Sequence, residues 1–329
     1  MKAKYRVILV FSLIILSFLS YKLSSAKVNS DIQLPKLVQN SNLQKDIIYK
    51  ITSDEKPLKL DVYQPKNLRK EKSPVVVFIH GGAWVIGDKS VVRQNFREYV
   101  LKELVDNGYN VISINFTNID SNTHLEKTLQ DCKDVLTWIR DNAEKYKFDT
   151  DNIGVWGGSS GAHIAMLTAY NQEKETTESP QLKYVVNFYG PSDLNELFKT
   201  DANILLLEAF RMYYPKTYKT RHQKILQLTG FDIKTQKEKA IKRCEELSPI
   251  TYITEKTVPT LIFHGSGDSV VDISQSQLLA DVLEENNVYH QYFILDNAKH
   301  TFSNINLNEA KDVAEKTLEF IKSQTQYAR

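Results

Sequence analysis

The alternation of short apolar runs with longer stretches of helical period constrains the fold of this sequence most. Six runs of β-branched or aromatic residues are separated by segments whose apolar residues recur at helical spacing. Continuous apolar runs are typical of strands in a parallel sheet covered on both faces. The alternation therefore predicts βαβ crossovers and an α/β fold with a mostly parallel, doubly wound sheet. The predicted strands are 74–80, 110–116, 152–156, 183–189, 260–264 and 289–295, and the predicted helices are 91–107, 124–146, 160–172, 273–286 and 308–323.

Two parts of the domain, which we expect to span residues 45–329, depart from this rhythm. Residues 46–51 and 58–63 alternate in a strand-like way around a polar turn, which predicts a hairpin at one edge of the sheet. Residues 191–259 contain no strand pattern but carry helical patterns rich in Leu, Phe and Tyr. A structureless loop of that length would be unusual in a compact domain, so we expect an inserted helical cap there.

The first 26 residues have the composition of a secretory signal peptide. Residues 1–6 are positively charged, residues 7–19 are apolar apart from serines, and small residues occupy 24–26. We therefore expect a secreted or periplasmic protein. The apolar run is shorter than the roughly 20 residues that span a bilayer, so membrane contact is expected only if this segment stays uncleaved. The polar residues 27–44 are expected to form an exposed mature N-terminus.

Charge and cysteine content exclude several functions. The formal charge is +2, from 42 basic and 40 acidic residues, and loss of residues 1–26 removes four cations and no acid, leaving −2. The chain is therefore not a basic nucleic-acid binder. Cys132 and Cys244 are the two cysteines. Their pairing stays open, and neither has a neighbour at a zinc-ligand spacing, so we predict no metal and no cofactor.

The sequence GGSSG at 157–161 lies directly between a predicted strand and a predicted helix. In that context G-x-S-x-G forms a sharp turn that exposes the serine hydroxyl, and the glycines leave space around it. Ser159 is therefore the candidate nucleophile. The N–H of Ser160, at the start of the helix, is a candidate donor to an oxyanion. The alternative is a glycine-rich turn with a serine N-cap.

A second glycine cluster, HGGAW at 80–84, follows the predicted strand 74–80. A glycine-rich turn can present several N–H groups without a Cβ in the way of a substrate. Gly82 and Ala83 are the candidate oxyanion donors, and Trp84 is a candidate wall of the substrate pocket. For His80 we favour a structural hydrogen bond inside the turn over a catalytic role.

A serine nucleophile needs a general base, and seven histidines are available. His300 follows the last predicted strand on a loop at the same sheet edge as Ser159. It is therefore the preferred base, and His290, inside a predicted strand, is the fallback.

The base in turn needs a carboxylate to orient it. Asp268 ends the loop after the strand 260–264, from which it can reach His300, and is the preferred acid. Asp193 and Asp272 stay open as alternatives, the second as a helix cap.

With Ser159, Asp268 and His300 in that order behind the HGGAW turn, the sequence resembles the α/β-hydrolase family. Within it, the chain is similar to the carboxylesterase branch with an HGGxW turn, which includes acetyl esterases, sugar-ester deacetylases and kynurenine formamidase-like enzymes. The resemblance implies a serine carboxylesterase for small-molecule esters, with short acyl groups and acetylated sugars as the expected substrates. An amidase, formamidase or peptidase with the same triad, and a non-catalytic binding protein on the same scaffold, are the alternatives.

Overall fold

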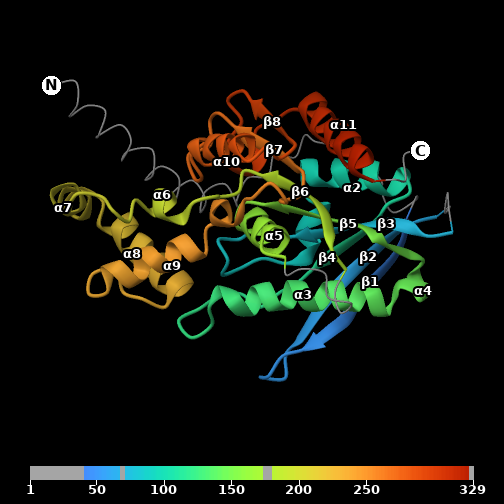
Figure 1. The fold of residues 1–329 in the computed structure, drawn as a ribbon, viewed down its shortest axis with the longest axis horizontal. Coiled ribbons are helices and arrows are strands. Elements are labelled where there is room, and N and C mark those ends of the chain that lie inside the picture. The colour runs from blue at the N-terminus through green and yellow to red at the C-terminus, as the bar shows by residue number, and fades with distance from the viewer. Residues whose placement is uncertain (1–40, 67–70, 173–179, 326–329) are drawn as a thin grey trace.

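One eight-stranded sheet organises the molecule (Figure 1). The computed structural model describes residues 41–66, 71–172 and 180–325. The strand order is β1-β2-β4-β3-β5-β6-β7-β8, and all neighbours from β4 to β8 are parallel. The mostly parallel sheet predicted from the apolar runs is thereby confirmed. The strands are β1 Ser41–Ile51, β2 Pro57–Pro65, β3 Ser73–Ile79, β4 Asn110–Ile114, β5 Phe148–Gly158, β6 Leu182–Phe188, β7 Thr260–Gly265 and β8 His290–Leu295.

The predicted edge hairpin is present, because β1 pairs antiparallel with β2, which pairs antiparallel with β4. Its first strand begins earlier than expected. Ser41 lies opposite Pro65 and Gln44 opposite Val62. The prediction of an exposed N-terminus up to residue 44 is therefore wrong for residues 41–44, where backbone pairing with β2 outweighs a polar sequence. The predicted signal peptide and residues 27–40 lie outside the described residues.

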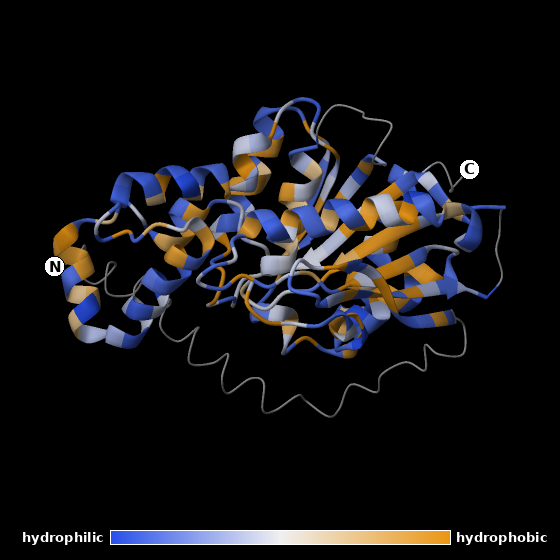
Figure 2. Cartoon of the chain, turned by 90° about the horizontal axis from the view of Figure 1, so that it is seen from below, coloured by the Kyte–Doolittle hydropathy of each residue, from blue (hydrophilic) through white to orange (hydrophobic). Residues whose placement is uncertain are grey.

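Helices cover both faces of the sheet. Residues of α2 and α11 pack on one face, and residues of α3, α5 and α10 pack on the other. Every residue of β3 and β4 is buried, as expected for central strands between two helical layers. Figure 2 shows the central strands largely in orange and the outer helices with more blue. These helices are α2 Phe96–Asp106, α3 Leu125–Asp141, α4 Ala143–Tyr146, α5 Ser160–Tyr170, α10 Ser274–Glu285 and α11 Leu307–Gln324.

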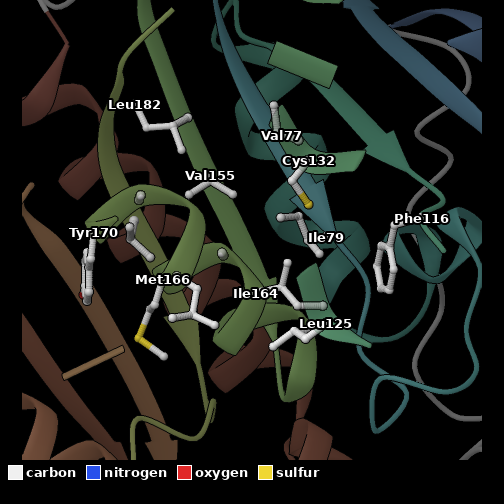
Figure 3. Close-up of a cluster of buried hydrophobic side chains, with 14 of the residues drawn as sticks. Val77, Ile79, Phe116, Leu125, Cys132, Val155, Ile164, Met166, Tyr170 and Leu182 are labelled. Atoms are coloured by element: carbon white, nitrogen blue, oxygen red, sulfur yellow. The ribbon is translucent and has the colours of Figure 1, made fainter. Parts of the chain in front are cut away.

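Buried apolar side chains of α5 face those of the sheet and of α3 (Figure 3). Ile164 and Met166 of α5 lie in one cluster with Val77 of β3 and Val155 of β5, and each of the four is at most 3% exposed. Cys132 of α3 belongs to the same cluster. Burial of this apolar surface fixes α5, and with it the turn that precedes it, against the middle of the sheet.

Helices fill the interval between β6 and β7, where the sequence predicts an inserted cap. They project from one end of the sheet (Figure 1). In that interval the described chain contains no strand. The inserted elements are α6 Leu194–Phe198, α7 Ile204–Tyr213, α8 Pro215–Thr229, α9 Lys237–Glu246 and the 3₁₀ helix η3 Pro249–Tyr252.

Both cysteine thiols are free and buried. Burial raises the pKa of Cys244 to about 12 and raises the pKa of Cys132 further. The pairing that the sequence left open is therefore absent from the structure. Among the described residues, no helix combines the length and apolar character needed to cross a membrane.

Candidate active site

Ser159 occupies a strained turn between β5 and α5. Its φ of 56° and ψ of −129° place a non-glycine residue in a conformation that side chains disfavour. The N–H of Ser159 donates to the carbonyl of Phe188 on β6 at 2.9 Å, which holds the turn at the carboxyl end of the sheet. The structure thus forms the sharp strand-to-helix turn predicted from the glycine spacing.

Glycines allow this turn because the surrounding backbone is too close for a side chain. A Cβ on Gly161 would lie 2.2 Å from the carbonyl oxygen of Ile79 in β3. A Cβ on Gly81 would lie 2.7 Å from the carbonyl oxygen of Gly158 and 3.3 Å from the Cβ of Ser159. The HGGAW turn after β3 and the serine turn after β5 are therefore in direct contact.

A hydrogen-bonded chain joins Ser159, His300 and Asp268. The Nε2 atom of His300 lies 3.0 Å from the Oγ of Ser159, and its Nδ1 lies 2.7 Å from the Oδ2 of Asp268. Because the carboxylate accepts from Nδ1–H, the neutral imidazole presents an unprotonated Nε2 to the serine hydroxyl. The structure brings together the three residues that the sequence selected from distant segments.

Asp268 is buried yet remains ionised. Burial alone would raise the pKa of Asp268, but the neighbouring His300 and the hydrogen bonds from His264 and His300 together lower it below the usual range of a carboxylate. The N–H groups of Val270 and Val271 donate to its Oδ1 at 2.8 and 3.1 Å. These donors fix the carboxylate and keep it negative opposite His300.

Aromatic packing holds the loop that carries His300. Thr301 and Phe302 both have positive φ, at 62° and 52°. The Phe302 ring is 2% exposed, and its centroid lies 5.0 Å from that of Phe96 and 4.7 Å from that of Tyr189. The ring of Tyr189 also packs edge-on against the imidazole of His300 at 5.1 Å. Buried aromatic contacts therefore offset the strain of the loop and orient its histidine.

The backbone N–H groups of Gly82, Ala83 and Ser160 donate to no acceptor within residues 41–66, 71–172 or 180–325. Gly82 has a φ of 130° and Ala83 a φ of 51°, so the turn bends sharply after β3. Ser160 is the first residue of α5, where the amide dipoles add partial positive charge. The structure thus places unpaired donors on both sides of the contact between the two turns.

Trp84 lines the pocket beside these donors and is held by a histidine of α5. Its indole N–H donates to the Nδ1 of His163 at 3.2 Å, and the Nε2–H of His163 donates to the carbonyl of Leu247 at 2.8 Å. Burial lowers the pKa of His163 to about 4, which keeps the ring neutral and Nδ1 able to accept. This hydrogen-bonded arrangement was not predicted from the sequence.

The residues considered as alternatives to His300 and Asp268 lie away from Ser159 or make other hydrogen bonds. His290 begins β8 and contacts the carbonyl of Val288 through Nδ1 at 3.0 Å, at the opposite end of the strand from His300. The Asp193 carboxylate caps α6, and the Asp272 carboxylate accepts from the N–H of Ser274 at 2.9 Å. His80 is buried, and its Nδ1–H donates to the carbonyl of Gly81 at 2.8 Å, as expected for a structural role.

A pocket of about 460 Å³ lies between the serine turn and the inserted helices. Ser159, Ser160, Ala83 and Trp84 line it on one side, and residues of α6, α7 and α8 line it on another. Among the lining residues are Arg221 and Lys224 of α8, which the sequence analysis did not select. Cations on an amphipathic helix usually face solvent, so their position at the pocket could be recognised only from the structure.

No group of three or more potential metal ligands occurs in the described parts of the chain.

The family of the chain follows from a match over most of its length. The BD-FAE family model matches residues 60–283, more than half of the 329 residues. The chain belongs to the BD-FAE family. A dienelactone hydrolase family model also matches residues 244–325 of this BD-FAE family member, the part that contains Asp268 and His300.

Several curated relatives of this BD-FAE family member are esterases. Esterase LipC of Mycobacterium tuberculosis is 25% identical over 231 residues, which cover 68% of this chain and 51% of LipC. Esterase LipQ of the same organism is 24% identical over 270 residues, which cover 80% of this chain and 58% of LipQ. The chain spans about half the length of the curated relatives it matches.

Solved structures share the fold. Esterase B from Lactobacillus rhamnosis has a TM-score of 0.70 at 19% identity, covering 97% of this chain and 96% of that structure. A truncated carbohydrate esterase from gut microbiota has a TM-score of 0.67 at 20% identity, covering 88% of this chain and 98% of that structure. The predicted α/β-hydrolase fold of this BD-FAE family member is thereby confirmed.

Proposed function

We propose that this BD-FAE family member is a serine carboxylesterase that cleaves short-chain carboxylic esters through an acyl-enzyme. The observation that carries the proposal is the chain of contacts at 3.0 and 2.7 Å from Ser159 through His300 to Asp268, next to unpaired backbone amides. Such an arrangement supplies a nucleophile, a base and an oxyanion site in one place. The apolar pocket beside Ser159 has room for a small ester.

In the proposed acylation step, the Oγ of Ser159 attacks the ester carbonyl carbon while its proton passes to the Nε2 of His300. The carbonyl oxygen becomes an oxyanion that accepts hydrogen bonds from the N–H groups of Gly82, Ala83 and Ser160. Collapse of this intermediate breaks the bond to the alcohol, which leaves with the proton from His300. Each backbone donor is typically worth about 3 kcal/mol of transition-state stabilisation.

Deacylation uses the same groups, with water as the nucleophile in place of Ser159. Water takes the place of the alcohol and gives a proton to His300 as it attacks the acyl carbon. The second intermediate collapses to the carboxylic acid, and His300 returns the proton to Ser159. Asp268 stays ionised throughout and stabilises the imidazolium that forms in each step.

Two comparisons support an ester as substrate. Curated relatives LipC and LipQ are named esterases, and a carbohydrate esterase is among the solved structures with the same fold. Acetylated sugars therefore belong in the substrate panel beside simple short-chain esters.

The test combines turnover with labelling. We expect hydrolysis of p-nitrophenyl acetate and butyrate, with a decline at longer acyl chains, and slower release from p-nitroacetanilide. An organophosphate should modify Ser159 as seen by peptide mass spectrometry, and Ser159→Ala should abolish both turnover and labelling. Ser53→Ala, in the exposed β1–β2 turn, is the matched control and should retain both. Labelling at another residue, or turnover by Ser159→Ala equal to that of the unaltered chain, would refute the proposal, and faster cleavage of the anilide would assign an amidase instead.

Export is a second part of the proposal and is tested separately. The charged, apolar and small-residue segments of residues 1–26 support cleavage after Ala26 and release outside the cytoplasm. N-terminal sequencing of protein recovered from outside the cytoplasm should begin near Lys27. Recovery of the full-length chain in the membrane fraction would indicate an uncleaved anchor instead.

A further inference from the structure

Two cations of α8 face the pocket that contains Ser159. Arg221 and Lys224 are three residues apart on one face of α8, and both line the pocket together with Thr217 one turn earlier. The pocket is mostly apolar, so two basic side chains in it need an explanation. Buried or partly buried cations in proteins are usually paired with a carboxylate.

Arg221 is 9% exposed and lacks an acidic partner among the described residues. Its Nε donates to the carbonyl of Phe198 at 2.6 Å, and its Nη2 donates to the carbonyl of Lys199 at 2.9 Å. Its Nη1 is buried and has no hydrogen-bond partner within those residues. The guanidinium is thus fixed by two backbone carbonyls, and its buried Nη1 has N–H donors without a partner at the pocket wall.

Lys224 also lacks a carboxylate partner in the part of the chain that the structure describes. Its Nζ donates to the carbonyl oxygen of Ala83 at 3.2 Å, which leaves two of its three N–H donors unused. Ala83 is one of the proposed oxyanion donors, so this ammonium lies beside the proposed oxyanion site. Burial alone lowers the pKa of Lys224 to about 8, and no neighbouring acid raises it.

The other charged residues that line the pocket have partners or face solvent. Lys199 pairs with Glu196, and Asp268 with His300. Asp272 is exposed and accepts from the N–H of Ser274 just before α10. Asp272 has no cationic partner in the described chain either, but water can screen its exposed charge. Among the described residues, Arg221 and Lys224 are therefore the pocket cations without an acidic partner.

We propose that the pocket binds an ester that carries a carboxylate on its acid or alcohol part, and that Lys224 and Arg221 are the residues that determine this specificity. The inference rests on the proposed esterase function and adds the substrate class. A bound carboxylate would accept charge-assisted hydrogen bonds from the free donors of both side chains. It would also supply the negative charge that these two cations lack, while the ester group faces Ser159.

The experiment compares pairs of esters that differ in charge and little in shape. Monoethyl adipate is paired with ethyl adipamate, and 4-acetoxybenzoate with 4-acetoxybenzamide, so that the carboxylate is tested on either side of the ester. Each is assayed by pH-stat at pH 7. We expect kcat/KM to favour the carboxylate over the amide in at least one pair by about tenfold, as for a charge-assisted contact in a partly buried site.

Variants of α8 separate recognition of charge from a structural role. Lys224→Gln should reduce the carboxylate-to-amide ratio of kcat/KM about tenfold. Lys224→Arg keeps the charge and should restore most of the ratio. Lys219→Gln is the matched control, because Lys219 is an exposed cation on the same helix outside the pocket, and it should leave the ratio unchanged.

Binding to Ser159→Ala makes this inference testable apart from turnover. Calorimetric titration of that variant should show tighter binding of the favoured carboxylate ester than of its amide. A ratio near one in both pairs, or an equal ratio in Lys224→Gln and the unaltered chain, overturns the inference. If that happens while p-nitrophenyl acetate is still hydrolysed, the proposed esterase function stands. Tighter binding of the carboxylate without hydrolysis of any ester by the unaltered chain would refute the proposed esterase function and support the proposed carboxylate-binding site.

Discussion

The Nε2 atom of His264 lies 3.5 Å from the Oδ2 of Asp268, the oxygen that accepts the hydrogen bond from His300. Nε2–H also donates to the carbonyl of Val271 at 2.9 Å, so Nδ1 accepts from the hydroxyl of Ser276 at 2.6 Å. His264 is fully buried at the end of β7. It therefore acts as a positioning residue for the carboxylate that orients His300.

Replacing His264 with Leu should lower kcat about tenfold, the usual scale for a residue that supports an active group indirectly. KM should change little, because His264 does not line the pocket. Ser276→Ala is the control, since it removes the partner of Nδ1 and keeps the donor that faces Asp268, and its kcat should fall less. Steady-state kinetics at constant pH make the comparison. A larger loss in Ser276→Ala would contradict this role.

Asp268→Asn should reduce kcat by about 10⁴, because an amide can donate to the imidazole and favour the wrong tautomer. Circular dichroism should show an unchanged fold. Asp272→Asn keeps an acceptor for the N–H of Ser274 and removes the same charge from the neighbouring loop, so its kcat should stay within about twofold. Equal kcat values for the two variants would show that the contact between Asp268 and His300 is not used in turnover.

Phe302→Ala should disturb both stability and turnover. The ring is buried among Phe96, Phe188 and Tyr189, and truncation of a buried phenylalanine costs about 3 to 5 kcal/mol. Loss of this support should also let His300 move away from Ser159. Phe302→Leu fills most of the space and should recover most of the stability in urea unfolding. Wild-type kcat in a destabilised Phe302→Ala protein would show that the ring does not position His300.

Preference for a carboxylate ester should decline as pH rises through about 8, the pKa of Lys224. Above that pH the amine is neutral, whereas the substrate carboxylate stays ionised. The ratio of kcat/KM for the carboxylate and amide esters, measured from pH 6.5 to 9.5, should therefore fall in the unaltered chain. Lys224→Arg stays charged throughout this range and should give a flat profile. A decline of equal size in both proteins would assign the effect to another group.

Lys224→Met should raise thermal stability at pH 7. The folded-state pKa of about 8 is below the ordinary value of 10.5, so the folded protein bears an unfavourable charge below pH 8. That cost disappears as pH rises from about 8 toward 10.5, where the unfolded lysine also becomes neutral. We expect a gain of about 2 °C in Tm at pH 7 that shrinks by pH 10. A lower Tm at pH 7 would show that the contact with Ala83 outweighs the cost of burying the charge.

Much of the fold, and the three residues Ser159, Asp268 and His300, could be predicted because the sequence patterns that indicate them are local. Strands of a buried parallel sheet have continuous apolar runs, and the turn at Ser159 needs glycines where backbone from β3 leaves no room for a Cβ. Once strand ends are assigned, Asp268 and His300 follow from their positions after β7 and β8. These predictions depend on spacing along the chain.

The pocket could not be predicted in the same way because it depends on how distant elements pack. The cationic residues Arg221 and Lys224 belong to a polar helix. Arg221 is covered where α8 packs against the end of α6, and Lys224 where α8 meets the turn at Ala83. The contact between His163 and Trp84 joins residues 79 positions apart in the same manner. The early start of β1 is also decided by pairing with β2, because residues 41–44 have no strand signature of their own.

The close approach of Gly161 to the carbonyl of Ile79 bears on how this protein can adapt to different molecules. It packs the end of β3 directly against the first turn of α5, so we expect the nucleophile and the amide donors to keep their relative positions. Differences in substrate preference should then arise in the inserted helices. A few substitutions along α8 can change which substrate the pocket binds without moving Ser159, His300 or Asp268.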